Sequence, residues 1–126
     1  ATAKALQHYQ GAVAVMSFNP FSVLEMRRQA PQIARGLTTE VFTKEEWPKI
    51  SKDKRLNLTN ISDFEKCEAS FISHNHEDLE SAPVRALKAK GVPILCWTIE
   101  TKAQQHAARQ LADNFTFEGF QPATSY

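Results

Sequence analysis

The sequence has little of what marks several specialised classes of protein. Its two cysteines, Cys67 and Cys96, lie far apart, which argues against a disulfide framework, and two cysteines alone cannot close a zinc site. No apolar run approaches the roughly 18–20 residues of a membrane-spanning helix, since the longest are residues 11–16 and 92–97. No long basic block is present and the net charge is +1, which argues against a dedicated nucleic-acid binder.

What is present is the composition of one small globular unit. The 126 residues are 42% hydrophobic, which excludes wholesale disorder. No charged-then-apolar leader is seen, so we expect a cytoplasmic protein. The chain starts abruptly at Ala1, inside a helical pattern, and this suggests a fragment or a processed piece. We expect residues 1–126 to form a single α/β unit.

Strand-like and helix-like segments alternate along the chain. Short apolar runs predict strands at residues 12–18, 33–38, 69–73, 92–98 and 114–120, and the first of them is typical of a strand buried on both faces. Helical spacing and capping residues predict helices at residues 3–9, 20–30, 82–90 and 102–111. Such alternation favours a parallel sheet with right-handed crossovers. Five strands in this length fit a small doubly wound domain or about half of a (β/α)8 barrel, which needs roughly 250 residues when complete.

Residues 41–66 differ from the rest, because charged residues crowd them and apolar residues are scattered. We interpret this stretch as a surface excursion with a short helix near residues 61–67. Glu40 and Glu100 follow predicted strand ends, where catalytic groups often lie. We nevertheless expect both to be loop or cap-region residues.

His74 and His76 stand two residues apart at a predicted strand end, with Glu77 and Asp78 beside them. This spacing could serve a metal, and a solvated loop is the alternative that we favour. Cys96 is expected to lie between strand and helix as a small buried hydrophobe.

Three runs carry a resemblance to a known family. Residues 17–20 (SFNP) close a strand and open a helix, residues 91–99 (GVPILCWTI) end a late strand, and residues 113–122 (DNFTFEGFQP) follow near the C-terminus. In this order and spacing they resemble the second half of the glycerophosphodiester phosphodiesterase family. The resemblance spans about residues 11–122. The sequence departs from the family pattern at Glu100, where Asn is usual, and at Glu118, in place of a T-D pair.

The resemblance implies a TIM-type (β/α)8 barrel, of which this chain would be the C-terminal half, with the active site at the C-terminal ends of the strands. It implies metal-dependent hydrolysis of a glycerophosphodiester to glycerol phosphate and an alcohol, with Mg²⁺ or Ca²⁺ as the cation. The family's H-R-G, E-x-D, H-D and E-x-K runs are missing from this sequence. We therefore expect this chain to supply no catalytic histidine and no metal ligand, and to be inactive alone.

The resemblance also implies substrate-binding positions. Alternation along a barrel strand places one row of side chains inward; these are Ala12, Ala14, Met16 and Phe18 in one strand, and Pro93, Leu95 and Trp97 in another. Phe18 and Trp97 would form apolar walls against the glycerol moiety, and Asn75 is a third candidate to face the substrate. The alternative is that each aromatic side chain fills the top layer of the core.

A half-barrel would leave two strand edges unpaired and its inward row exposed. The expected partner is therefore the missing N-terminal half or a second copy of the chain in a homodimer, besides a small phosphodiester substrate. The competing hypotheses are a stand-alone α/β ligand-binding or interaction domain without catalysis, and a metal hydrolase that uses His74 and His76.

Overall fold

The computed structural model describes residues 1–123. The strands are β1 (Ala14–Ser17), β2 (Ala34–Thr39), β3 (Phe71–Asn75), β4 (Ile94–Ile99) and β5 (Asn114–Phe117). The helices are α1 (Thr2–Leu6), α2 (Pro20–Gln29), α3 (Lys52–Thr59), α4 (Ala82–Ala89) and α5 (Lys102–Leu111), with a short 3₁₀ helix, η1 (His76–Asp78), after β3. None of these helices is long and apolar enough to cross a membrane.

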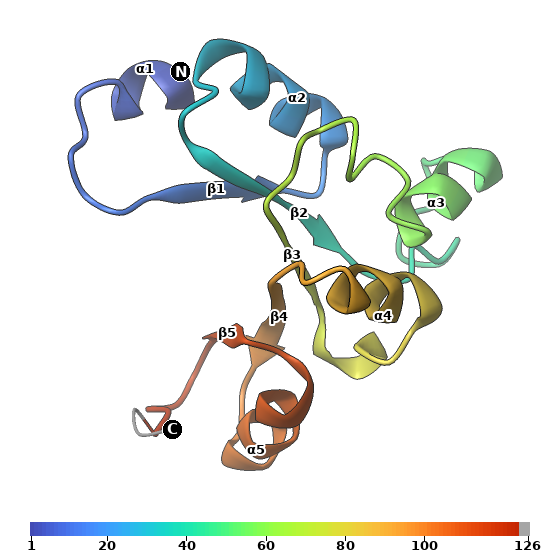
Figure 1. Ribbon diagram of the computed structural model, residues 1–126. Helices are drawn as coiled ribbons and strands as arrows, with labels where there is room; N and C mark the ends of the chain where they lie inside the picture. Colours follow the sequence, from blue (N-terminus) through green and yellow to red (C-terminus); the bar gives the residue numbers. More distant parts are fainter. Residues whose placement is uncertain (124–126) are drawn as a thin grey trace.

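The strands pair in chain order, β1-β2-β3-β4-β5, and every pair is parallel. A doubly wound sheet reverses its strand order at a switch point, so that alternative is wrong for this chain. The sheet curls, and helices α2 to α5 lie over its convex face while its concave face carries no helix of the described chain (Figure 1). This is the half-barrel that the sequence predicts.

The core lies between the convex face of the sheet and the helices. Leu37, Ile72 and Ile94 are register partners on three neighbouring strands, and all three are buried. Val84 of α4 belongs to the same cluster. Cys96 is fully buried within it, which confirms its expected place between strand and helix.

Local signals define where the helices begin. The Asn19 side chain accepts a hydrogen bond from the Phe21 amide at 3.0 Å and Pro20 takes the first helical position, as expected for α2. Thr101 and Gln104 form the predicted capping box of α5. Ser81 occupies the N-cap position of α4, but its hydroxyl makes no capping hydrogen bond.

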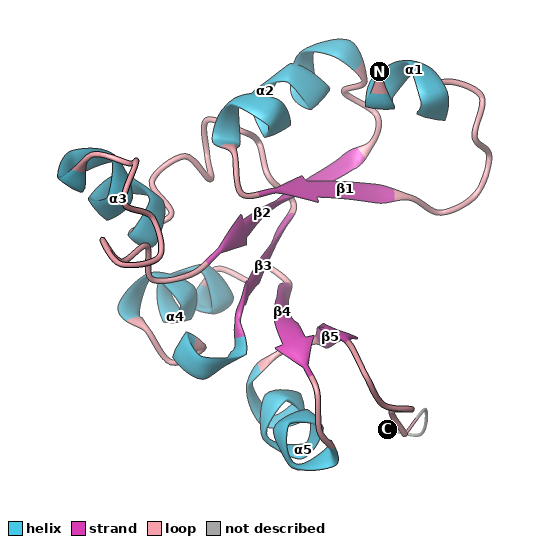
Figure 2. Cartoon of the chain, turned by 180° about the vertical axis from the view of Figure 1, so that it is seen from behind, coloured by secondary structure: helices cyan, strands magenta, loops and turns pink. Residues whose placement is uncertain are grey.

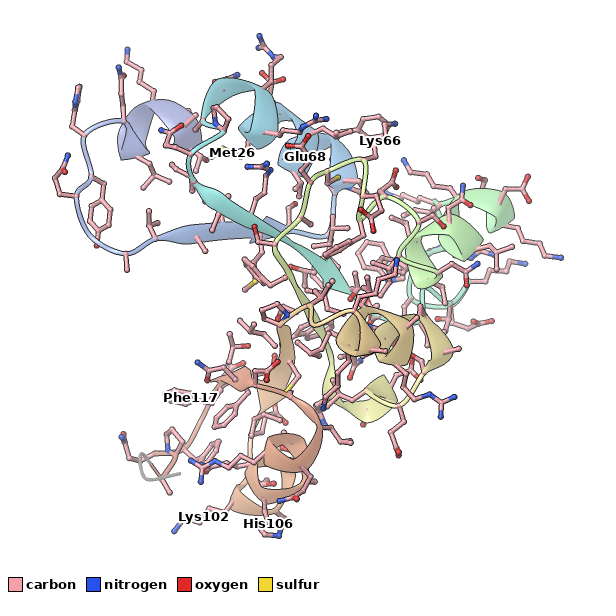
Figure 3. The ribbon with its side chains drawn as sticks, viewed as in Figure 1. Met26, Lys66, Glu68, Lys102, His106 and Phe117 are labelled. Carbon is pink, nitrogen blue, oxygen red and sulfur yellow. The ribbon has the colours of Figure 1, made fainter. Side chains whose placement is uncertain are left out.

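The segment between β2 and β3 departs most from its prediction. Its helix is α3, capped by Ser51, and not a helix near residues 61–67, where the positive φ of 53° at Ile61 interrupts helical geometry. Several of its apolar side chains are buried, among them Phe42, Leu58, Ile61 and Phe64, whereas Val41 and Leu56 are exposed. The last part of the segment runs beside α2 (Figure 3), where Arg27 donates to the Lys66 carbonyl and pairs with Glu68.

Candidate functional site

Figure 2 shows the curled sheet from behind, with its concave face free of helices. The side chains of this face would line the interior of a barrel. Register partners in a parallel sheet share a face, and one such row runs across four strands: Thr38, Ser73, Leu95 and Asn114. One row nearer the C-terminal ends of the strands come Glu40, Asn75 and Trp97. Near the edge, Met16 on β1 is 44% exposed. Polar and apolar groups therefore meet at one end of this face.

Four aromatic rings meet at this end of the sheet. Phe18 packs edge-on against Trp97, with ring centroids 5.3 Å apart and planes at 84°. It also contacts Trp47 at 5.6 Å and Phe42 at 6.3 Å, and these two rings lie 5.1 Å from each other. We call these four side chains the aromatic cluster. An open pocket of about 250 Å³, the rim pocket, lies beside the cluster and is lined by Phe18, Phe42, Trp47 and Ile50 among others.

Trp97 is fixed at its polar end as well as by packing. Its indole Nε1–H donates to the carbonyl oxygen of Ser73 at 3.0 Å, which joins β4 to β3. Asn75, the register partner of Trp97, lies at the end of β3. The structure thus brings together the three residues that we predicted for substrate binding: Phe18, Asn75 and Trp97.

Glu40 is a residue of this site to which the sequence assigned no role beyond that of a loop or cap-region residue. It does lie in the loop that directly follows β2, but it is only 8% exposed. Its Oε1 accepts a hydrogen bond from the Trp47 indole Nε1–H at 2.9 Å, and the Asn75 side chain also hydrogen-bonds to it. Burial raises the pKa of the Glu40 carboxyl, because loss of water disfavours the charged form.

His74 belongs to the other face of the sheet. It is the register partner of Cys96 and is buried on the helix side. Its Nδ1 lies 2.7 Å from the Thr39 hydroxyl and its Nε2 3.3 Å from Asp78 Oδ2, so both ring nitrogens have partners. Among residues 1–123 no group of three or more His, Cys, Asp or Glu is placed to hold a metal ion. The described residues therefore supply no third ligand for a metal site built on His74 and His76.

The remaining acidic residues near the strand ends, and Cys96, show no arrangement that suits catalysis. Glu100 is exposed, and its amide donates to the Gln104 side chain at 2.8 Å, so it is the cap-region residue that we expected. Glu118 is exposed after β5. Asp113 accepts a hydrogen bond from the Ile94 amide at 2.7 Å and so joins β5 to β4. Burial raises the pKa of the Cys96 thiol to about 11, which is the reverse of what a nucleophilic thiol requires.

Several solved structures share this fold, and two of them are compared with this chain. A phosphodiesterase of Oleispira antarctica, in complex with the product sn-glycerol-3-phosphate, matches 92% of this chain and 43% of its own, with a TM-score of 0.64 and 18% identity. A protein of Silicibacter pomeroyi DSS-3, assigned as a glycerophosphoryl diester phosphodiesterase, matches 90% of this chain and 37% of its own, with a TM-score of 0.65 and 15% identity. No protein-family model matches the chain, and no curated protein matches its sequence.

This chain thus spans less than half the length of the structures that it matches. The likeness confirms, at the level of the fold, both the half-barrel and the resemblance that the three sequence runs indicate. Trp47, by contrast, comes from residues 41–66, which we interpreted as a surface excursion, and Glu40 directly precedes them. The place of Glu40 at a predicted strand end, combined with a tryptophan seven positions later, is the signal that could have predicted their contact.

Proposed function

We propose that this chain is the C-terminal half of a cytoplasmic (β/α)8-barrel phosphodiesterase, which hydrolyses glycerophosphodiesters to glycerol phosphate and an alcohol. The observation that carries the proposal is the shared fold: two phosphodiesterase structures match 92% and 90% of this chain. One of the two was solved with sn-glycerol-3-phosphate, a product of this reaction class. The order of the three sequence runs supports the same activity.

In this proposal the concave face lines the substrate pocket. Phe18 and Trp97 present ring surfaces that suit the C–H groups of a glycerol moiety, and Asn75 adds an amide that can hydrogen-bond a hydroxyl group. The site lies at the C-terminal ends of the strands, where barrel enzymes carry their chemistry. The half-buried state of Phe18 and Trp97 supports this role, since part of each ring remains available for contact.

The described residues do not fit a divalent cation. They contain no ligand group of three, and the buried carboxylate of Glu40 already accepts hydrogen bonds from Trp47 and Asn75. The Mg²⁺ or Ca²⁺ ligands and the acid–base histidines of the whole enzyme would therefore lie outside this chain, and we derive no catalytic step through them. On this proposal the chain is inactive alone.

The proposed partner is the structure that completes the barrel. Strands β1 and β5 are the edges of the sheet, and Ala14 and Met16 are exposed on its concave face. Free strand edges beside exposed apolar side chains favour pairing with further strands. An N-terminal half of the same protein would supply these strands, and a second copy of the chain in a homodimer is the alternative.

An assay of two proteins side by side tests the function. The chain of residues 1–126 and the product of the intact open reading frame are each incubated with bis-(p-nitrophenyl) phosphate and with a glycerophosphoalcohol, with and without Mg²⁺ or Ca²⁺. We expect cation-dependent hydrolysis by the longer protein alone. Hydrolysis by residues 1–126 would contradict the proposal of an inactive half, and no hydrolysis by either would favour a ligand-binding domain without catalysis.

A further inference from the structure

The segment between β2 and α3 reaches the candidate site through two aromatic side chains, Phe42 and Trp47. Over residues 41–50 it contains no regular helix or strand, and its charged residues Lys44, Glu45 and Glu46 are exposed. Trp47 is half-buried among the aromatic cluster, where its ring contacts Phe18 and Phe42. Turn hydrogen bonds hold the backbone of this loop, and the Trp47 amide donates to the Thr43 carbonyl at 3.0 Å. These bonds leave the side-chain torsions of Trp47 free, so a separate contact is needed to hold its ring in one place.

Glu40 supplies that tie. Its carboxylate accepts the Trp47 indole N–H at 2.9 Å and a side-chain hydrogen bond from Asn75. One buried group therefore joins β2, the loop and the end of β3. Asn75 is fixed in turn, because its Oδ1 accepts a hydrogen bond from the Glu77 amide at 3.0 Å.

The surroundings of Glu40 make these hydrogen bonds costly to lose. Among residues 1–123 Glu40 takes part in no ion pair. The charged neighbour that acts on it is Glu46, which has the same sign and raises its pKa further, whereas the hydrogen bonds from Trp47 and Asn75 lower it. His76, Glu100 and Glu118 are the other titratable groups that directly follow strands of the sheet. A buried carboxylate with no cation beside it is stabilised by the neutral groups that donate hydrogen bonds to it. Losing these donors costs several times the free energy of one exposed hydrogen bond.

We propose that Glu40 is a positioning residue, which holds the Trp47 indole against Phe18 and so builds the wall shared by the aromatic cluster and the rim pocket. The positioning itself does not depend on the proposed function. The statement that this wall flanks the substrate rests on that function.

A nuclear magnetic resonance titration tests the positioning. The protein is labelled with ¹⁵N-tryptophan, and the indole N–H signal of Trp47 is assigned by its loss in Trp47→Phe. As the pH falls from about 7 to about 4, we expect this signal to move with a midpoint above the ordinary glutamate value of 4.5, because its acceptor becomes protonated. In Glu40→Gln, which keeps an acceptor oxygen but does not titrate, we expect the movement to be lost.

Two matched variants separate Glu40 from its neighbours. Glu45→Gln removes an exposed carboxylate of the same loop and should leave the titration unchanged. Glu46→Gln should keep the movement but lower its midpoint, because it removes a like charge that acts on Glu40. A Trp47 signal that does not move in the wild type, or that moves equally in Glu40→Gln, would overturn the proposal.

The phosphodiesterase assay adds an independent arm. If the longer protein is active, Glu40→Ala should raise KM more than it lowers kcat, and Glu40→Gln should restore part of the lost KM. A titration that depends on Glu40 in a protein without activity would sustain the positioning and refute the function. Activity of the longer protein, together with a Trp47 signal that moves equally in the wild type and in Glu40→Gln, would sustain the function and refute the positioning.

Discussion

Trp97 shows how a single residue can be held firmly and still remain available to a ligand. Its Nε1–H is bonded to the Ser73 carbonyl and its ring packs on Phe18, yet the side chain is only half-buried. The hydrogen bond orients the ring, while the exposed part of the ring leaves room for a substrate. The same combination of an anchored polar end and an open ring surface occurs at Trp47, through Glu40.

We predict that Trp97→Ala raises KM or lowers kcat of the complete barrel with a modest loss of stability. The expected loss is below the roughly 3–5 kcal/mol of a buried aromatic deletion, because fewer contacts are removed. Ile94→Ala, at a fully buried position of the same strand, is the control and should cost about 2–5 kcal/mol without a specific effect on KM. Urea unfolding and steady-state kinetics measure both. If Trp97→Ala fails to fold, Trp97 is a packing residue.

We predict that His74 makes the stability of the protein depend on pH. Burial holds its pKa below the ordinary 6.5, although Asp78 opposes this shift. Below about pH 6.5 the unfolded chain takes up a proton that the folded chain resists, so the free energy of unfolding falls as the pH falls through this range. Chemical unfolding at about pH 7 and pH 5 should show a smaller decrease in His74→Gln than in the wild type.

The control for this pH dependence is His106→Gln. His106 is exposed on the side of α5 that faces away from the sheet (Figure 3). This variant should keep the wild-type decrease. Equal decreases in all three proteins would show that His74 does not govern the pH dependence.

At the scale of the elements, removal of the N-cap hydroxyl can be tested in both α5 and α4, and we expect different results. Thr101→Ala removes the hydroxyl of a complete capping box and should cost about 1 kcal/mol. Ser81→Ala removes an N-cap hydroxyl that is buried and unpartnered, so its effect should be close to zero or stabilising. Thermal or urea unfolding of the two variants measures the difference. Equal losses would contradict the assignment of the two caps.

The elements also show what the sequence could predict. The five strands, the Asn19 cap and the Thr101 box were predictable because each depends on residues within one short segment. The loop at residues 41–50 was not, because Trp47 meets Phe18 and Glu40, which follow β1 and β2, only after folding. The inward alternation that places Phe18 and Trp97 at the site is local, whereas the burial of Glu40 is produced by tertiary packing.

At the scale of the whole molecule, the open concave face determines the expected assembly. We predict that residues 1–126, produced alone, form a species of at least twice the 14.2 kDa of one chain, or bind an added N-terminal half. Light scattering after size-exclusion chromatography measures the mass. A monodisperse monomer that unfolds cooperatively would contradict the half-barrel's need for a partner and would favour the stand-alone domain.

Matched charge substitutions locate the surface responsible. Met16→Glu places a charge on the concave face, where the side chain is 44% exposed, and should weaken association. Leu56→Glu places the same charge on α3, at a side chain that is 57% exposed away from that face, and should leave association unchanged. Equal effects would show that association does not use the concave face.

The order of the strands bears on how the protein is made. Because β2 to β5 each pair with the strand synthesised just before them, no pairing has to wait for a distant part of the chain. The sheet can be extended one strand and one helix at a time as the nascent chain leaves the ribosome. Growth in this direction makes β5 the last of these five strands to join the sheet. In the proposed barrel, whose other half would be translated first, β5 would then meet strands that are already folded.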